Sequence, residues 1–120
     1  MSCVLRISGL GINELLSKIS LEAYRVEDDC AHFLVSEADF DDFKSQIKDA
    51  ISFLQSHRAD VSLMMGKPDV NGVLDFAIEW RDVAFQFDTF PAEIVREAGN
   101  FGLSLELSHY PASEGSDAKA

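Results

Sequence analysis

The sequence predicts an α+β fold: a mainly antiparallel sheet with helices packed on one of its faces. Short segments in which apolar and polar residues alternate recur along the chain, as expected of strands with one buried face. Between them lie segments with apolar residues at helical spacing, the longest from about Asp39 to His57. Neighbouring strands separated by only a few residues indicate antiparallel hairpins, and hairpins with helices on one side form an α+β sandwich.

The first third of the chain predicts a strand, a helix and a hairpin. Residues 3–8 alternate, and a glycine-rich segment ends this strand. Residues 12–19 carry leucine and isoleucine at helical spacing, which predicts a short amphipathic helix of about two turns. Two strand-like runs follow within residues 21–37. Asp28 and Asp29 between them supply turn chemistry, because aspartate accepts local backbone hydrogen bonds.

The longest predicted helix runs from about Asp39 to His57. Its apolar residues, beginning with Phe40, recur at i, i+3, i+7, i+10, i+11 and i+14 and form one stripe. We expect Asp39 to be the N-cap, with Asp41 and Asp42 in the first turn, where negative charge suits the helix dipole. These carboxylates lack the spacing of a calcium-binding loop, so we interpret them as capping residues and not as metal ligands.

The second half of the chain predicts four strands and one helix. Residues 61–65 and 74–80 alternate as strands, and residues 83–87 alternate again after a tight reversal. The last two of these segments are close enough in sequence to form an antiparallel hairpin. A helix capped by Thr89 follows, and residues 103–107 form the last strand.

The resulting element order is β-α-β-β-α-β-β-β-α-β, and no linker separates two domains. This order resembles a ferredoxin-like domain with extra strands. The length of 120 residues also suits one domain. We therefore expect a single α+β domain over residues 1–110 and a disordered tail over residues 111–120, which are polar and small.

Three parts of the sequence resemble a family of small uncharacterised bacterial domains of unknown function. They are VLRISG at the start, the long central helix, and FPAEIVREAGNFGLSLELSHYP near the end. Members of that family look like ferredoxin-type sandwiches that open with a strand ending in glycine and close with a strand ending in an aromatic residue. Gly9 and Tyr110 occupy those places here. The chain is also similar in size and charge to immunity proteins that neutralise bacterial toxins. Neither resemblance implies a catalytic motif.

The chain is strongly acidic. Ten lysines and arginines stand against 21 aspartates and glutamates, which gives a formal net charge of −11. That balance argues against binding to nucleic acid or to an anionic membrane surface, because both need clustered cations. No apolar run reaches the length of a membrane span, and the start lacks the pattern of a signal peptide. We expect a cytoplasmic protein in which Cys3 and Cys30 are reduced.

No catalytic residue, metal ligand or cofactor is predicted. His32, His57 and His109 are far apart in sequence and belong to no recognised ligand or base motif. Cys30 follows two aspartates, and adjacent negative charge raises the pKa of a thiol and weakens it as a nucleophile. An enzyme is therefore the last of three functional hypotheses. A histidine meeting a carboxylate or Cys30 in a cleft would revive it.

A candidate binding surface is the face of the sheet turned away from the helices. If the leucines and phenylalanines of the strands point to the helices, five polar side chains share the opposite face: Arg6, Asp75, Glu79, Gln86 and Glu106. One interpretation is a solvated face in which Arg6 forms a weak ion pair. The other is a surface for a partner, which apolar residues on the same face would favour.

The first functional hypothesis is a non-enzymatic protein-interaction module, with an immunity-type inhibitor as its most specific form. An acidic domain of this size would attract a basic protein partner, and strand edges that need covering would favour a homodimer. The alternative hypothesis is a small-molecule binding or sensing domain. Its pocket would be lined by aromatic residues: Phe76, Trp80, Phe85, Phe87 and Phe101.

Overall fold

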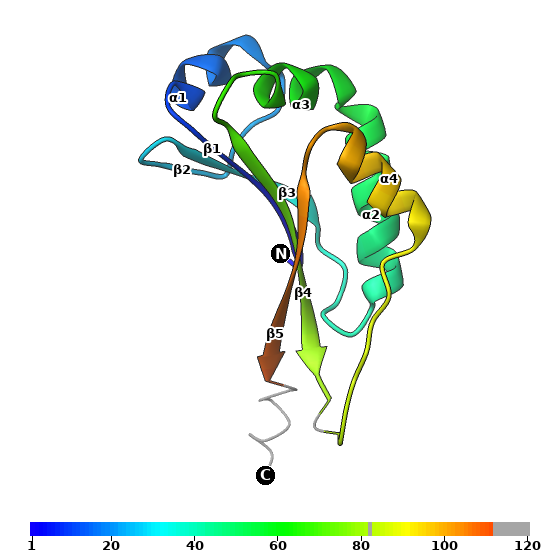
Figure 1. The fold of residues 1–120 in the computed structure, drawn as a ribbon. Coiled ribbons are helices and arrows are strands. Elements are labelled where there is room, and N and C mark those ends of the chain that lie inside the picture. Colours follow the sequence, from blue (N-terminus) through cyan, green and yellow to red (C-terminus); the bar gives the residue numbers. More distant parts are fainter. Residues whose placement is uncertain (82, 112–120) are drawn as a thin grey trace.

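The computed structural model describes residues 1–81 and 83–111 and confirms the α+β class. Figure 1 shows a curved sheet of five strands with α2, α3 and α4 packed against one side of it. In chain order the elements are β1 (Cys3–Ser8), α1 (Ile12–Leu15), the 3-10 helix η1 (Leu16–Lys18), β2 (Arg25–Glu27), β3 (Cys30–Ser36), α2 (Phe43–Ser56), α3 (Arg58–Met65), β4 (Asn71–Trp80), α4 (Ala92–Asn100) and β5 (Ser104–Pro111). Pro111, expected in the tail, ends β5, and the rest of the expected tail and residue 82 of the expected reversal lie outside the described residues.

The sheet is mixed, not wholly antiparallel. Its strand order is β2-β3-β1-β4-β5, with β1 antiparallel to both β3 and β4 and β2 antiparallel to β3. The β2–β3 hairpin is the one predicted around Asp28 and Asp29, whose φ values of 35° and 62° suit a tight hairpin turn. β5 runs parallel to β4, and α4 makes the crossover that a parallel pair requires.

Residues 61–65 lie in a helix, so the strand predicted there is wrong. α2 is interrupted at His57, and α3 continues directly after it. Val61 and Met64, three residues apart, are fully buried, whereas Leu63 between them is exposed. Apolar residues at 61, 63 and 65 predicted a strand, but the apolar residues at 61 and 64 also fit the i, i+3 spacing of a helix. A helix here extends the core contacts of α2 without requiring a free sheet edge.

Residues 83–87 do not form a strand, so the hairpin predicted after β4 is also wrong. Both edges of β4 are already occupied near its end. On one side β5 pairs with it up to its last residue. On the other side the N–H groups of Ala77 and Glu79 donate to the carbonyls of Ser2 and Phe40, at 2.7 and 3.1 Å. A further strand would have no row of free backbone groups to pair with.

α2 begins later than predicted. Its N-cap is Asp42, whose Oδ1 accepts a backbone N–H of the first turn at 3.1 Å, and not Asp39. Phe40 therefore leaves the predicted apolar stripe and is 39% exposed. Gln46 takes an unexpected place in the core: it is fully buried, and its Nε2 donates to the carbonyl of Ala77 at 2.8 Å. This bond ties α2 to β4.

α4 begins after Pro91, which takes the N-cap position that was expected of Thr89. The chain leaves the helix through Gly102. Its φ of 75° lies in the left-handed region that favours glycine.

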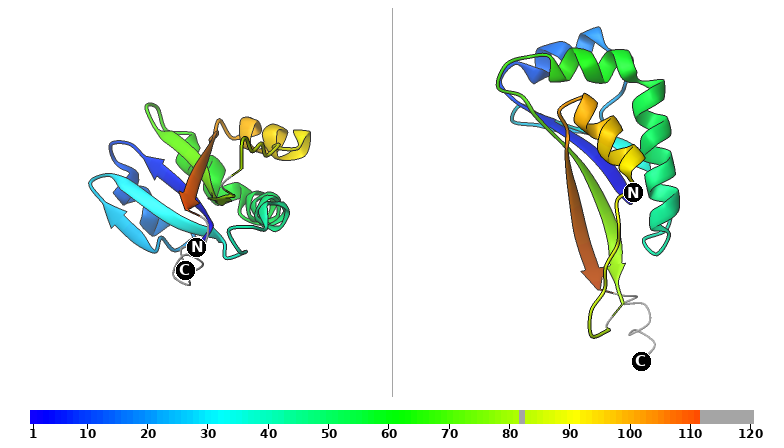
Figure 2. Two further views of the ribbon diagram at one scale, coloured as in Figure 1. Left: turned by 90° about the horizontal axis from the view of Figure 1, so that it is seen from below. Right: turned by 45° about the vertical axis from the view of Figure 1, so that its right-hand side comes forward.

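Figure 2 shows the helices on one side of the sheet, and the buried side chains of the core come from both layers. Buried side chains come from every layer: Leu5, Ile7, Phe33, Leu74 and Phe76 from the sheet, and Ile12, Ala50, Leu54, Val61, Met64, Ile94 and Ala98 from the helices. This one cluster includes residues from both halves of the chain.

Candidate functional site

A polar cluster on the sheet joins Arg6, Asp75 and Glu106, three of the five residues of the candidate face. Arg6 of β1 donates from Nη1 to Asp75 Oδ2 of β4 at 2.9 Å and from Nη2 to Glu106 Oε1 of β5. Ser108 Oγ donates to the other oxygen of Asp75 at 2.8 Å. Burial lowers the pKa of Arg6, but the hydrogen bonds to the two carboxylates outweigh it and raise that pKa above its ordinary value. The cluster therefore links the three strands β1, β4 and β5.

Glu79 and Gln86, the other two predicted face residues, meet through the backbone and not on the sheet face. Gln86 Nε2 donates to the carbonyl of Glu79 and to Asp88 Oδ2, both at 3.1 Å, and its Oε1 accepts the N–H of Arg81 at 2.9 Å. The amide thus bonds the end of β4 as a neighbouring strand would. It holds the β4–α4 loop, residues 81–91 without residue 82, against the sheet.

A cysteine, a histidine and a carboxylate meet at the β2–β3 hairpin, the combination that would revive an enzymatic role. Cys30 Sγ lies 3.6 Å from His32 Nε2, and Glu27 Oε2 lies 3.4 Å from the same nitrogen. In a catalytic triad the histidine contacts the nucleophile through one ring nitrogen and the acid through the other. Here Cys30 and Glu27 both lie beside the same nitrogen of His32, Nε2. Burial, more than neighbouring acids, raises the pKa of the Cys30 thiol, which disfavours the thiolate. The geometry therefore does not support a nucleophile here.

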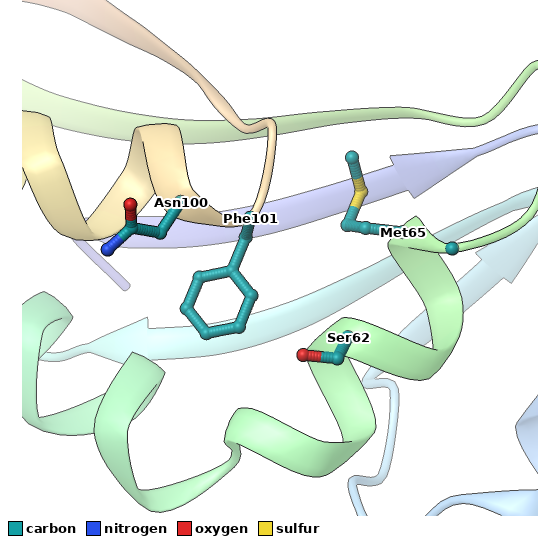
Figure 3. A pocket seen from close by; sticks show the side chains of 5 residues that line it. Ser62, Met65, Asn100 and Phe101 are labelled. Carbon is teal, nitrogen blue, oxygen red and sulfur yellow. The ribbon is translucent and has the colours of Figure 1, made fainter.

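A small hollow lies between the ends of α3 and α4, with a volume of about 260 Å³. It is lined by Ser62, Met65, Gly66, Asn100 and Phe101, and Figure 3 shows the side chains that face it. The guanidinium carbon of Arg58 lies 5.8 Å from the centroid of the Phe101 ring. None of the five lining residues is an acid or a base, so the hollow offers no group for proton transfer.

The five aromatic residues proposed to line one pocket do not converge, so this part of the small-molecule hypothesis is wrong. Phe76 is fully buried in the core. Trp80 packs edge-on against a histidine of β5, with ring centroids 5.7 Å apart. Phe101 borders the hollow between α3 and α4, while Phe85 and Phe87 project from the β4–α4 loop into solvent.

The strands β4 and β5 end side by side, low in Figure 1. Exposed aromatic residues lie on these strand ends, on the β4–α4 loop and just before α2. We call Phe40, Trp80, Phe85, Phe87 and Tyr110 the aromatic end. Phe85 and Phe87 are 71% and 76% exposed and stack with centroids 6.1 Å apart. Phe40 and Tyr110 form a second pair at 5.4 Å. Aromatic side chains are usually largely buried, so their grouped exposure marks a candidate interaction surface.

A groove adjoins the aromatic end, between the start of α2 and the β4–α4 loop, which run side by side in Figure 2. Its volume is about 440 Å³, and we call it the acidic groove. It is lined by Asp41, Asp42, Phe43, Lys44, Phe87, Asp88 and Thr89. Three carboxylates against one ammonium group give it a negative potential, so its polar part suits a cation.

The carboxylates of the acidic groove are only partly engaged. Asp42 uses Oδ1 to cap α2. Asp88 accepts from Gln86 and lies 3.9 Å from Arg81. Asp41 is exposed, and no other residue in the described ranges donates a hydrogen bond to its side chain. The arrangement therefore keeps carboxylate oxygens available beside aromatic rings.

Sequence reasoning did not find this site. The alternation at residues 83–87 predicted that Phe85 and Phe87 face the core, and Asp41 and Asp42 were interpreted through the helix alone. No local signal reports that residues 41–44 and 87–89 meet, because that contact depends on where the β4–α4 loop passes.

Comparison of this chain with protein families, curated proteins and solved structures finds no match. Within residues 1–81 and 83–111, no group of three or more histidines, cysteines and carboxylates is arranged to hold a metal ion. In the same part of the chain, no helix combines the length and the apolar character needed to cross a membrane.

Proposed function

We propose that this chain is a non-enzymatic interaction module that binds a basic protein partner through the aromatic end and the acidic groove. The observation that carries the proposal is the exposure of the stacked pair Phe85 and Phe87. Large aromatic side chains that become buried on association supply much of the binding energy of many interfaces. A surface of this kind favours binding over catalysis, which would need a positioned acid, base or nucleophile.

The β4–α4 loop is suited to this role because it is held before any partner arrives. Gln86, between the two phenylalanines, makes three hydrogen bonds that fasten the loop to the end of β4 and to itself. A surface that is already ordered loses less conformational entropy on binding. The two rings are therefore presented in one arrangement.

The charge of the chain determines the chemistry of the partner. The net charge is −11, and three aspartates line the acidic groove. Such a surface accelerates and orients the approach of a partner rich in lysine and arginine. The similarity in size and charge to immunity proteins supports a basic toxin as the most specific form of this partner.

The test compares wild type with the double variant Phe85→Ser and Phe87→Ser. A matched control, Leu10→Ser with Val26→Ser, removes two exposed apolar side chains elsewhere (83% and 46% exposed). Partners retained by tagged wild type from the native host at low and moderate salt are identified, purified and titrated by calorimetry.

We expect a basic protein that binds wild type and control alike and binds the aromatic variant at least about tenfold more weakly. Equal affinity for both variants would contradict the proposed surface. So would partners that carry no excess of basic residues.

A homodimer through β5 is a second interaction that one observation favours. Among the described residues, β5 pairs along one edge only, and its one acidic residue, Glu106, is already bonded to Arg6. Natural edge strands usually carry unpaired charges that block such pairing. Sedimentation that finds only monomer at high concentration would reject the dimer.

A small-molecule function also keeps one supporting observation. The volume of the acidic groove, about 440 Å³, is in the range of ligand sites. Its aspartates would select a cationic ligand, which a thermal-shift screen of organic amines and their neutral analogues would detect.

A further inference from the structure

We infer that the acidic groove holds an arginine side chain of the partner. This inference rests on the proposed function and deepens it, because it names the chemical group that the surface recognises. It follows from the aromatic rings and the carboxylates that line the groove and from the presence of Lys44 among them.

The walls of the groove suit a long side chain with an apolar stem. Phe43 meets Phe76 and Phe90 edge-on, with ring centroids 5.8 and 5.4 Å apart, so contacts with the core hold its ring in place. Phe87 offers a ring that is 76% exposed and backed by Phe85 at 6.1 Å. The methylene groups of an arginine can pack on these rings while its charged head remains among polar groups.

The head of the side chain would meet carboxylates that keep free acceptors. Asp42 uses Oδ1 for the helix cap, and no residue of ranges 1–81 and 83–111 donates a hydrogen bond to its Oδ2. Asp41 is exposed, and in the described part of the chain neither of its oxygens accepts a hydrogen bond from another residue. A guanidinium donates two parallel hydrogen bonds to one carboxylate and forms a stronger pair than a neutral donor does.

Arginine fits these neighbours better than lysine does. Its planar guanidinium can stack on the face of Phe87 while its N–H groups reach Asp41 or Asp42. An ammonium group is a compact, strongly hydrated charge that cannot make the bidentate contact. We therefore expect arginine to bind more tightly than lysine, and a neutral isostere of arginine to bind least.

Replacing Lys44 should change the affinity in the opposite direction from replacing the other residues of the groove. Lys44 lines the same groove, so its ammonium group repels any cation that enters. Replacing Lys44 with glutamine should therefore strengthen binding, although most substitutions in a binding site weaken it. Replacing Asp41 with asparagine or Phe87 with alanine should weaken it.

The test titrates the full chain with three probe peptides: acetyl-Gly-Arg-Gly-amide and the same peptide with citrulline or lysine in the central place. Backbone amide shifts of residues 41–44 and 87–89 report binding in the groove. We expect the arginine peptide to bind about fivefold more tightly than the lysine peptide and the citrulline peptide to bind least.

The variants separate a specific pocket from a general effect of charge. D41N should weaken the arginine peptide about fivefold, and K44Q should tighten it about threefold. The matched control D69N removes one negative charge at an exposed left-handed turn position that asparagine tolerates, and it should leave the affinity unchanged. Citrulline binding as well as arginine, or D69N weakening the peptide as much as D41N, would overturn the inference.

The peptide titration and the partner-binding test can fail independently of each other. If a basic partner requires Phe85 and Phe87 but the arginine peptide shifts no groove residue, the interaction surface stands and the arginine site is wrong. If the peptide behaves as expected but the purified partner binds the aromatic variant normally, the groove binds arginine peptides, and both the proposed docking surface and the placement of the partner's arginine in the groove are wrong.

Discussion

Arg6→Met is the substitution that tests what the polar cluster on the sheet contributes. Methionine keeps an apolar stem of similar length, so the change removes mainly the guanidinium. Asp75 then keeps Ser108 as a neutral donor, at 2.8 Å. Asp75 and Glu106 also occupy directly opposite positions of the parallel β4–β5 pair, so their like charges would face each other without a cation between them.

The magnitude follows from burial. The side chains of Arg6 and Asp75 are 30% and 16% exposed, between a solvent-exposed pair and a buried one. Exposed pairs contribute up to about 1 kcal/mol, and breaking a buried pair costs about 3–5 kcal/mol. We expect Arg6→Met to lower the free energy of unfolding by about 2 kcal/mol, which is about 8 °C in Tm for a domain of this size.

Urea denaturation of the variant and of a matched control, Arg25→Met, measures this effect. Arg25 forms an ion pair on the same sheet face with Glu27, but the two side chains are 61% and 47% exposed. The control should lose less than about 0.5 kcal/mol. Adding Asp75→Asn to Arg6→Met should restore part of the loss, because it removes the repulsion. If Arg6→Met costs no more than Arg25→Met, the cluster does not stabilise the sheet as reasoned.

Three further predictions concern the loop, the thiols and the hairpin. Gln86→Ala should speed amide hydrogen exchange across the β4–α4 loop while lowering the unfolding free energy by only about 1 kcal/mol, since its bonds are local; unchanged exchange would show that the amide does not hold the loop. Iodoacetamide should modify Cys30 more slowly than a free thiol, because burial raises the pKa of Cys30. It should modify Cys3 only on unfolding, because full burial raises the pKa of Cys3 and blocks access to it. Rapid modification of both thiols in the native protein would contradict this. Asp28→Asn with Asp29→Gly should stabilise the fold by about 0.5–1 kcal/mol in urea, because both positions have positive φ, and a loss of stability would refute that reading of the turn.

At this end of the molecule the side chains of two glutamines bond backbone groups that a neighbouring strand or a helix cap would usually bond. Gln46 is fully buried, and its Nε2 joins the carbonyls of Ala77 in β4 and Asp39 before α2. Gln86 bonds the carbonyl of Glu79, beyond Phe76, the last residue of β4 that pairs with β1, and also bonds the N–H of Arg81. The first holds the segment that precedes α2 and the second holds the β4–α4 loop, so together they support both sides of the acidic groove.

The sequence predicts correctly those helices, strands and turns whose signal lies within a few neighbouring residues. Residues 3–8 and 74–80 lie in strands, and the helix predicted over residues 12–19 is present as the short α1 and the 3-10 helix η1, because alternation or helical spacing reports which side chains one face can bury. The Asp28-Asp29 turn was predicted for the same reason, since its chemistry lies within four residues. Of the candidate face, Arg6, Asp75 and Glu106 bond one another, whereas Gln86 bonds the carbonyl of Glu79 from the β4–α4 loop, and a partner-binding role for the face stays a prediction.

The sequence by itself determined the α+β class, the acidity of the surface and the hairpin at the sheet edge, because composition, periodicity and turn chemistry act over short distances. Only the tertiary structure decided that residues 61–65 form part of a helix and residues 83–87 part of a loop. An alternating segment becomes a strand only where a sheet edge is free to accept its hydrogen bonds. β4 has β5 on one edge and the carbonyls of Ser2 and Phe40 on the other, so the segment after it became a loop with two phenylalanines in solvent. The candidate site exists because that long-range competition for backbone partners left those rings outside the core.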